Sequence, residues 1–175
     1  NFEGGPLGQP AEDLDYLMKV NVNSALVMSQ LSAPHLEKTK GSIVNISSIV
    51  AYPAASMGPF YYSMSKAAMD SLTIHLAGNL IKQGIRVNSV NPGIVRTDFI
   101  GKLGMPAEAS TALYDKYAED KDGLPVGRCG VPDDIAQAIL FLADSSKSSF
   151  IIGQRLAVDG GTTIKNMMLS AEPKW

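Results

Sequence analysis

Apolar residues recur every three or four positions in three stretches of the sequence, which is the spacing of one face of an α-helix. The first stretch covers 11–38, and the second, which is the most regular, covers 62–83. Gly84, directly behind the second stretch, is typical of the position just past a helix end. The third stretch, 132–142, opens with a proline and two acids, which suit a first helical turn. The pattern therefore predicts three long helices.

Short runs rich in β-branched residues alternate with these helices. They cover 41–48, 84–91 and 150–158, and turn residues such as glycine and proline lie around them, so we expect each run to form a strand. An alternation of helices and strands is typical of a parallel sheet that is covered by helices. The expected fold class is therefore α/β, in a single domain over 1–175.

Parallel sheets bind their ligands beyond the carboxyl ends of the strands. The loops that follow Ser47, Asn91 and Val158 are therefore the places where we expect a functional site.

The segment 98–123 is polar, irregular and compatible with helix. Residues 162–175 are expected to form a tail of weak helical character.

Composition narrows the range of functions. The 17 acids and 15 bases of the 175-residue chain give a net charge of −2 without a block of like charges, which argues against binding to nucleic acid. No uncharged apolar run reaches the roughly 18 residues that a membrane span needs, so we expect no membrane partner. The single cysteine, Cys129, and the two histidines predict neither a disulfide framework nor a metal site. An unpaired cysteine favours a reducing, cytoplasmic compartment.

Tyr62 and Lys66 stand four positions apart in the second predicted helix, so their Cβ atoms are expected about 5–6 Å apart on its surface. An ammonium near a phenol favours the phenolate and lowers the pKa of the phenol from about 10. We therefore expect Lys66 to tune Tyr62 for donating or accepting a proton near neutral pH. The same pair also fits an ordinary amphipathic surface, because tyrosine and lysine occur at this spacing on many helices.

Two further polar positions strengthen the catalytic interpretation. Ser47 and Ser48 end the first predicted strand, where a hydroxyl faces the crevice of a parallel sheet and can reach the substrate oxygen that Tyr62 protonates. Serines at a strand end also satisfy turns, which is the plainer interpretation. Asn21 interrupts an otherwise apolar part of the first predicted helix, which indicates a local hydrogen-bonding role or a kink.

Taken together and in order, these motifs resemble those of the short-chain dehydrogenase/reductase family, over about residues 11–161. The resemblance implies a Rossmann-like, doubly wound parallel sheet. It also implies an oxidoreductase that transfers a hydride between a nicotinamide cofactor and a carbonyl or secondary alcohol. The matching motifs are Asn21, Asn45-Ile-Ser-Ser48, Tyr62-x-x-x-Lys66, Asn91-Pro-Gly93 with Thr97, Gly127-Arg-Cys-Gly130, Gly153-Gln154 and Val158-Asp-Gly-Gly161.

The resemblance also implies a role for each catalytic candidate. Tyr62 would be the general acid/base, and Lys66 would lower its pKa and hold the ribose hydroxyls next to the nicotinamide. Ser48, rather than the adjacent Ser47, would orient the substrate oxygen and stabilise the negative charge that develops on it. Asn21 would anchor a water that links Lys66 to solvent for proton relay.

The cofactor site implied by the resemblance lies at the loop after the second predicted strand. Pro92-Gly93 and the backbone at Ile94 and Val95 would pack against the nicotinamide and hydrogen-bond its carboxamide. Thr97 would reach the carboxamide or the pyrophosphate. The residues expected to bind NAD or NADP are Tyr62, Lys66, Pro92, Gly93, Ile94, Val95 and Thr97.

The sequence lacks the family's Gly-rich phosphate loop and the residue that selects NAD or NADP. The chain begins at Asn1, about where the family's Asn-Asn-Ala-Gly strand end would finish. We therefore expect a sheet that is incomplete in its N-terminal half, in a chain that is the C-terminal part of a longer enzyme. Two interpretations stay open: an active oxidoreductase, or a truncated, catalytically silent protein for binding or dimerisation.

The expected partners are a small-molecule carbonyl or alcohol substrate and further copies of the chain. The predicted helices 11–38 and 62–83 resemble those that form the family's four-helix dimer interface, which implies a homodimer or homotetramer. Their apolar residues fit a plain core equally well. The segment 98–123 corresponds to the family's substrate-covering loop, or to a mobile surface loop. The scaffold accepts steroids, sugars, acyl thioesters and small ketones, so the substrate is not specified.

Overall fold

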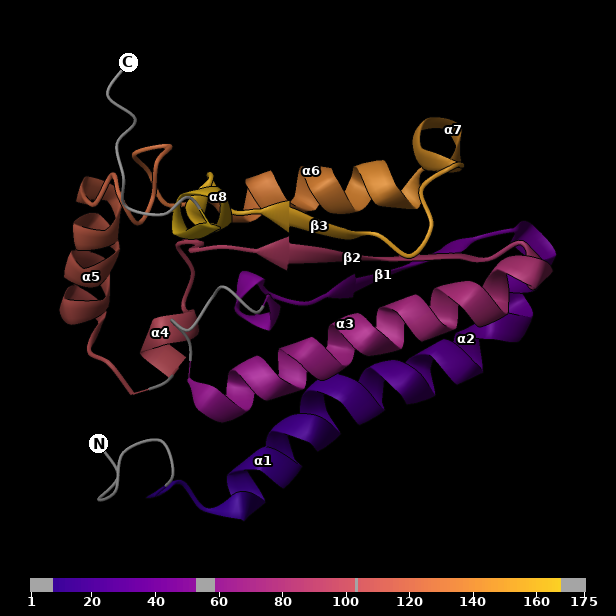
Figure 1. Ribbon diagram of the computed structural model, residues 1–175, viewed down its shortest axis with the longest axis horizontal. Coiled ribbons are helices and arrows are strands. Elements are labelled where there is room, and N and C mark those ends of the chain that lie inside the picture. Colours follow the sequence, from indigo (N-terminus) through magenta and orange to yellow (C-terminus); the bar gives the residue numbers. More distant parts are fainter. Residues whose placement is uncertain (1–7, 53–58, 103, 168–175) are drawn as a thin grey trace.

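The fold has three layers, with a parallel sheet between two sets of helices (Figure 1). The computed structural model describes residues 8–52, 59–102 and 104–167, with side chains described as far as residue 164. The helical elements in chain order are α1 (Ala11–Leu17), the π-helical segment η2 (Met18–Asn23), α2 (Ser24–Thr39), the 3₁₀ turn η3 (Ile49–Ala51), α3 (Phe60–Leu80), the 3₁₀ turn η4 (Ile81–Gln83), α4 (Phe99–Lys102), α5 (Ala107–Glu119), α6 (Pro132–Ala143), α7 (Ser145–Ser148) and α8 (Thr162–Met167). Helices α2 and α3 lie on one face of the sheet, and α6 lies on the other (Figure 1).

Three parallel strands form the sheet of the described residues, in the order β1 (Ser42–Ile46), β2 (Arg86–Pro92) and β3 (Arg155–Val158). The central strand β2 packs against α3 and α6, and its residues 86–91 are all buried. A parallel strand that is covered on both faces is typical of α/β proteins. The predicted α/β class with a Rossmann-like parallel sheet is therefore confirmed.

The first predicted helix, 11–38, forms as three consecutive segments rather than one. α1 continues into the π-helical turn η2, and η2 continues into α2. A π-turn holds an extra residue within a helix and often occurs at functional sites, and Asn21 lies in this one. Pro34 does not end the helix, because α2 continues to Thr39 and stops where Lys40 adopts a left-handed conformation with φ 52°.

The strand predicted over 150–158 forms only over its last four residues, so that prediction is wrong for the first part. Gly153 has a φ of 69°, which interrupts an extended backbone. Asn88 replaces the missing strand pairing with its side chain. Its Nδ2 donates to Ile151 O and its Oδ1 accepts from Gln154 N, each over 2.9 Å.

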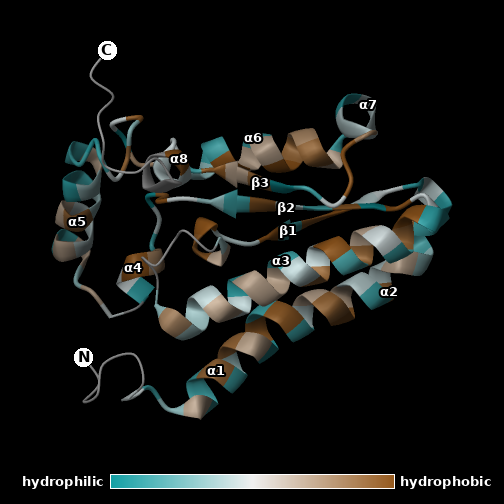
Figure 2. Ribbon diagram, viewed as in Figure 1, coloured by the Kyte–Doolittle hydropathy of each residue, from teal (hydrophilic) through white to brown (hydrophobic). Residues whose placement is uncertain are grey.

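The main hydrophobic core lies between the sheet and the helices α2 and α3. Burial of an aliphatic side chain stabilises a fold by about 1.5–3 kcal/mol, so this core fixes α3 over the sheet. Figure 2 shows apolar stretches on α2, α3 and α6, the helices that flank the strands. The centre of the core is Ala77, Ile85 and Val87, and the partly buried residues around it are Ala33, Leu36, Ile43, Leu76, Leu80 and Ile152.

The guanidinium of Arg86 connects the start of β2 to the end of α6. It is buried, and it donates to the carbonyl oxygens of Leu142, Ala143 and Ser148 over 2.9, 3.2 and 3.1 Å. The last carbonyls of a helix lack partners within it and carry partial negative charge, so a cation at that end is favourable. Arg86 therefore holds α6 in place on the sheet.

The segment 98–123 contains two short helices, α4 and α5, which lie beyond the carboxyl ends of the strands (Figure 1). Tyr114 of α5 is buried in a second small core with Leu124 and Cys129. The helix α8 occupies the start of the predicted tail, and the rest of that prediction, 168–175, lies outside the described residues. In the part of the chain that the structure describes, none of the helices has the length and apolar character of a membrane span.

Candidate active site

The carboxyl ends of the three strands converge on one edge of the sheet, beside α4, α8 and the start of α3 (Figure 1). Backbone hydrogen bonds connect the loops at this edge. Ser47 N donates to Val90 O over 2.9 Å, and Gly93 N donates to Val158 O over 3.0 Å. The loops predicted to carry a functional site therefore lie next to one another.

Three of the four predicted catalytic side chains come together at this edge. Lys66 Nζ lies 5.6 Å from the centre of the Tyr62 ring, one turn away on α3. The same Nζ donates to the carbonyl of Ile46, the last residue of β1, over 2.9 Å. The Ser48 hydroxyl interacts with the Tyr62 side chain by hydrogen bonding. A phenol, an ammonium and an alcohol thus lie within one small group.

The ionisation of this group is controlled mainly by burial. Burial raises the pKa of Tyr62 above its ordinary value of 10.0, and the hydrogen bond with Ser48 lowers that pKa only in part. Desolvation of the phenolate is the largest cause of this shift, and the role of Lys66, whose Nζ lies 5.6 Å from the ring centre, in lowering the pKa of Tyr62 stays a prediction. Tyr62 is therefore a protonated phenol at neutral pH, which is the form that a general acid needs.

The two adjacent serines have different surroundings. Ser47 is buried, and its Oγ donates to the carbonyl of Lys66 over 3.2 Å. Ser48 has an extended backbone, and its Oγ accepts from Val50 N over 3.3 Å and interacts with Tyr62. Successive residues of an extended chain point to opposite sides, which explains the separation. Ser48 is thus the serine whose hydroxyl lies beside Tyr62.

Asn21 reaches the same region from the π-turn η2. Its Nδ2 donates to Ser65 Oγ over 2.9 Å, and Ser65 Oγ donates in turn to the carbonyl of Tyr62 over 2.8 Å. Asn21 therefore contacts α3 at the residue before Lys66. The proton relay through a bound water stays a prediction.

The loop after β2 contains a close backbone approach at Gly93. Pro92 ends β2, and Gly93 follows it beside β3. A Cβ added at Gly93 would lie 2.8 Å from Asp159 Cα, closer than real Cβ atoms come, so this position requires glycine. The Pro92-Gly93 pair of the predicted cofactor site therefore also has a purely structural task.

The remaining predicted cofactor residues are fixed by backbone contacts. Ile94 O accepts from Gly130 N over 2.9 Å, and Val95 forms a parallel bridge with Gly130. The carbonyl of Thr97 accepts from the Tyr114 hydroxyl over 3.1 Å. These contacts hold the loop at the carboxyl edge of the sheet, at the end of β2.

The site also contains residues that the sequence reasoning missed. Asp70 is 2% exposed and lies one turn beyond Lys66 on α3. An acid four positions after the lysine was a signal in the sequence that could have identified it. Asn91 Nδ2 donates to both carboxylate oxygens of Asp70, over 3.1 and 3.0 Å. The ring of Phe99 lies 6.2 Å from that of Tyr62, a contact that depends on loop geometry and has no signal in the sequence.

Comparison with known proteins assigns the family. A family model described as enoyl-(acyl carrier protein) reductase matches residues 2–163. A 3-oxoacyl-(acyl-carrier-protein) reductase of Thermotoga maritima is 38% identical over 154 residues, which are 87% of this chain and 58% of that protein. Dehydrogenase/reductase SDR family member 4 of Sus scrofa is 35% identical, over 92% of this chain and 55% of that protein. The chain belongs to the short-chain dehydrogenase/reductase family.

Solved structures of the short-chain dehydrogenase/reductase family have a closely similar fold. A member of unknown function from Caenorhabditis elegans, solved with its cofactor, is 44% identical and has a TM-score of 0.86, over 89% of this chain and 58% of that one. A glucose dehydrogenase of Caenorhabditis elegans in the apo form is 41% identical and has a TM-score of 0.71, over 90% and 60% of the two chains. The chain spans less than two thirds of the length of these relatives. The predicted family resemblance is confirmed.

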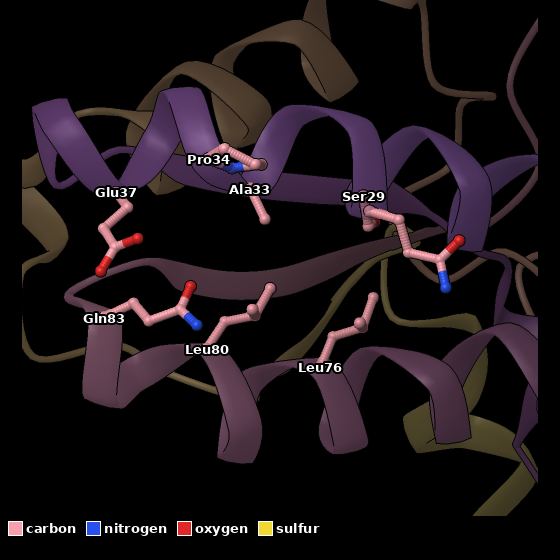
Figure 3. A pocket seen from close by; sticks show the side chains of 8 residues that line it. Ser29, Ala33, Pro34, Glu37, Leu76, Leu80 and Gln83 are labelled. Atoms are coloured by element: carbon pink, nitrogen blue, oxygen red, sulfur yellow. The ribbon is translucent and has the colours of Figure 1, made fainter.

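A hollow of about 330 Å³ lies between α2 and α3 of this short-chain dehydrogenase/reductase chain, apart from the Tyr62 group (Figure 3). Leu76 and Leu80 of α3 extend toward α2 across it, and Glu37 and Gln83 lie at one end (Figure 3). The full lining is Ser29, Gln30, Ala33, Pro34, Glu37, Leu76, Leu80 and Gln83. None of the predicted site residues lines this hollow.

Proposed function

We propose that this chain carries the catalytic residues of an oxidoreductase that transfers a hydride between NAD(P)(H) and a carbonyl compound or secondary alcohol. The observation that carries the proposal is the grouping of Ser48, Tyr62 and Lys66 at the carboxyl edge of the sheet. Relatives that are reductases and dehydrogenases by name support the same class of reaction. The substrate itself is left open.

In the reducing direction, Tyr62 donates its phenolic proton to the substrate oxygen. The phenol is protonated at neutral pH, as a general acid must be. The Ser48 hydroxyl donates a hydrogen bond to the same oxygen and stabilises the negative charge that develops there. Lys66 stabilises the phenolate that remains on Tyr62. Asn21 holds the water that returns a proton toward Lys66. In the oxidising direction the phenolate of Tyr62 accepts the proton of the alcohol.

The residues present fit a nicotinamide cofactor. When bound, NADH or NADPH would supply the hydride that adds to the carbonyl carbon. Lys66 has three N–H donors and, among the described residues, gives one to Ile46 O, so the others are available for ribose hydroxyls. The backbone at Ile94 and Val95 would hold the carboxamide, with Thr97 beside it.

We also propose that residues 1–175 belong to one NAD(P)-binding domain, and that the chain forms a homodimer or homotetramer in the cytoplasm. Exposed apolar side chains on α2 support a contact between subunits, since Val27, Met28 and Leu31 are 49%, 64% and 65% exposed. Exposed apolar patches of this kind often mark interaction sites.

The substitution Tyr62→Phe tests the proposed reaction. We expect kcat for carbonyl reduction with NADH or NADPH to fall by about a thousandfold, because the acid is lost, while the Kd of the cofactor changes by less than about twofold. Absorbance of the reduced nicotinamide measures turnover. Tyr61→Phe is the matched control, since the Tyr61 hydroxyl donates to Gln9 O over 3.0 Å and lies outside the group.

Retained kcat in Tyr62→Phe would contradict the role of Tyr62. If the unaltered chain shows no turnover with either cofactor on a steroid, a sugar, an acyl thioester and a small ketone, the alternative of a catalytically silent binding or dimerisation protein is favoured.

A further inference from the structure

Asp70 is a buried carboxylate beside the candidate active site, and the reaction steps above do not use it. It is 2% exposed. Asn91 Nδ2 lies 3.1 and 3.0 Å from its two oxygens, and Arg155 Nη1 on β3 lies 3.7 Å from its Oδ2. Burial of a carboxylate is costly unless it is paired and hydrogen-bonded, and an apolar side chain would fill the position at lower cost. The charge itself therefore points to a task.

The amide of Asn91 connects Asp70 to Ser48. Asn91 is fully buried, and its Nδ2 donates to Ser48 O over 3.1 Å as well as to the carboxylate. Its Oδ1 accepts from Ser89 Oγ over 2.8 Å. With both ends of the amide engaged, its orientation is fixed. Asp70 thereby fixes the backbone of the residue whose hydroxyl lies beside Tyr62.

Asp70 also acts on Lys66 through its charge. The two residues are four apart on α3, a spacing that brings Cβ atoms to about 5–6 Å. Burial lowers the pKa of Lys66, and the negative charge of Asp70 raises it. Two other groups face Asp70: Arg155 on β3, and Tyr52. The guanidinium carbon of Arg155 lies 5.6 Å from the centre of the Tyr52 ring. Asp159 acts on Tyr52 from beyond the end of β3.

We propose that Asp70 is a positioning residue for the reaction: it fixes the Ser48 backbone through Asn91, and its charge keeps Lys66 an ammonium beside Tyr62. The proposal rests on the proposed function, because it assigns Asp70 to the same group of residues. Asp70 does not touch the reacting atoms. Arg155, whose side chain is 41% exposed, partly balances its charge from the adjacent strand.

The first test is an NMR titration of the Lys66 side chain in the full chain, with lysine labelled at Cε. In Asp70→Asn, which keeps the shape and removes the charge, we expect the Lys66 pKa to fall by about one unit or more. Asp133→Asn is the matched control, because it removes the same charge from the exposed first turn of α6. An unchanged Lys66 pKa in Asp70→Asn would overturn the proposal.

A second variant keeps the test decisive if Asp70→Asn does not fold. Arg155→Gln removes the cation that opposes Asp70, at a half-exposed position. The charge of Asp70 then acts on Lys66 with less opposition, so we expect the Lys66 pKa to rise. A Lys66 pKa that stays constant or falls in this variant would also overturn the proposal.

The enzymatic consequence is a shift in the pH profile. Lys66 is charged below its pKa, so kcat for carbonyl reduction is lost as the pH rises through that value. In Asp70→Asn this alkaline limb moves to lower pH by about one unit, with KM within about twofold. An unaltered chain without turnover would refute the proposed function, while the titration of Lys66 would still decide the role of Asp70.

Discussion

Asn21 and Ser65 are 44 positions apart in the sequence, yet Asn21 Nδ2 donates a hydrogen bond to Ser65 Oγ over 2.9 Å. The bond joins the π-turn η2 to α3 at the residue before Lys66. Ser65 is fully buried and donates to the carbonyl of Tyr62. The π-turn therefore supports the helix that carries both the candidate acid and its lysine.

Asn21→Ala is expected to lower the free energy of unfolding by about 1 kcal/mol, because one interhelical hydrogen bond is lost. Urea denaturation measures the change. Asn23→Ala is the matched control, since Asn23 lies in the same π-turn with an exposed side chain and should be nearly neutral. Equal effects of the two substitutions would show that the bond to Ser65 contributes nothing.

Ser48→Ala and Ser47→Ala are expected to separate catalysis from stability. Loss of the Ser48 hydroxyl removes a donor to the substrate oxygen, so kcat should fall by about a hundredfold, while loss of its long 3.3 Å hydrogen bond from Val50 N should lower stability less than Ser47→Ala does. Loss of the Ser47 hydroxyl removes its buried bond to Lys66 O and should cost about 1 kcal/mol of stability. Steady-state kinetics and urea denaturation on both variants make the comparison. The reverse pattern would assign the catalytic hydroxyl to Ser47.

Arg86→Met is expected to lower the free energy of unfolding by about 3 kcal/mol. The carbonyls of Leu142, Ala143 and Ser148 would lose their charged donor at a buried position. Arg128→Met serves as the control, because Arg128 is an exposed cation whose pair with Asp134 is screened by water, so its loss should cost clearly less stability than the loss of Arg86. Thermal and urea unfolding give the values. A small effect at Arg86 would mean that water replaces its hydrogen bonds.

Acid is expected to weaken the start of α6 through Asp134. The Arg128 guanidinium and the Val131 backbone N–H lower the pKa of Asp134 from 3.8 to about 2. A carboxylate with a lowered pKa stabilises the folded state above its ordinary pKa, and this contribution is lost as the pH falls from 3.8 toward 2. In Asp134→Asn the stability should fall less steeply over that range. Urea midpoints between pH 5 and pH 2 test this, and parallel curves for the two proteins would contradict it.

The sequence was sufficient to predict which residues lie close together when they share one helix or follow adjacent strand ends. Tyr62 and Lys66 share a helix, so their spacing alone brought them together, and Ser48 followed from the position of a strand end beside that helix. The contacts of Asp70 with Asn91 and Arg155 join α3, β2 and β3, and they arise only when the three elements pack. A single sequence has no local pattern that reports them.

Other differences have local physical causes that compete with the hydrophobic pattern. The apolar run 150–158 has strand composition, but Gly153 turns the backbone and Asn88 takes over the hydrogen bonds. The helix 11–38 has a regular apolar period, which does not reveal a π-turn around Asn21. The pKa of Tyr62 depends on how much water the fold removes, and spacing along a helix does not determine that.

The contacts of β3 have a consequence for the order of synthesis. Arg155 and Val158 belong to β3, the last strand along the described residues, and they contact Asp70 and Gly93 from there. A ribosome makes Ser48, Tyr62 and Lys66 well before it reaches residue 155. A nascent chain, or the product of a stop codon upstream of residue 155, therefore contains Ser48, Tyr62 and Lys66. It lacks β3, whose contacts with Asp70 and Gly93 hold the surrounding elements in place.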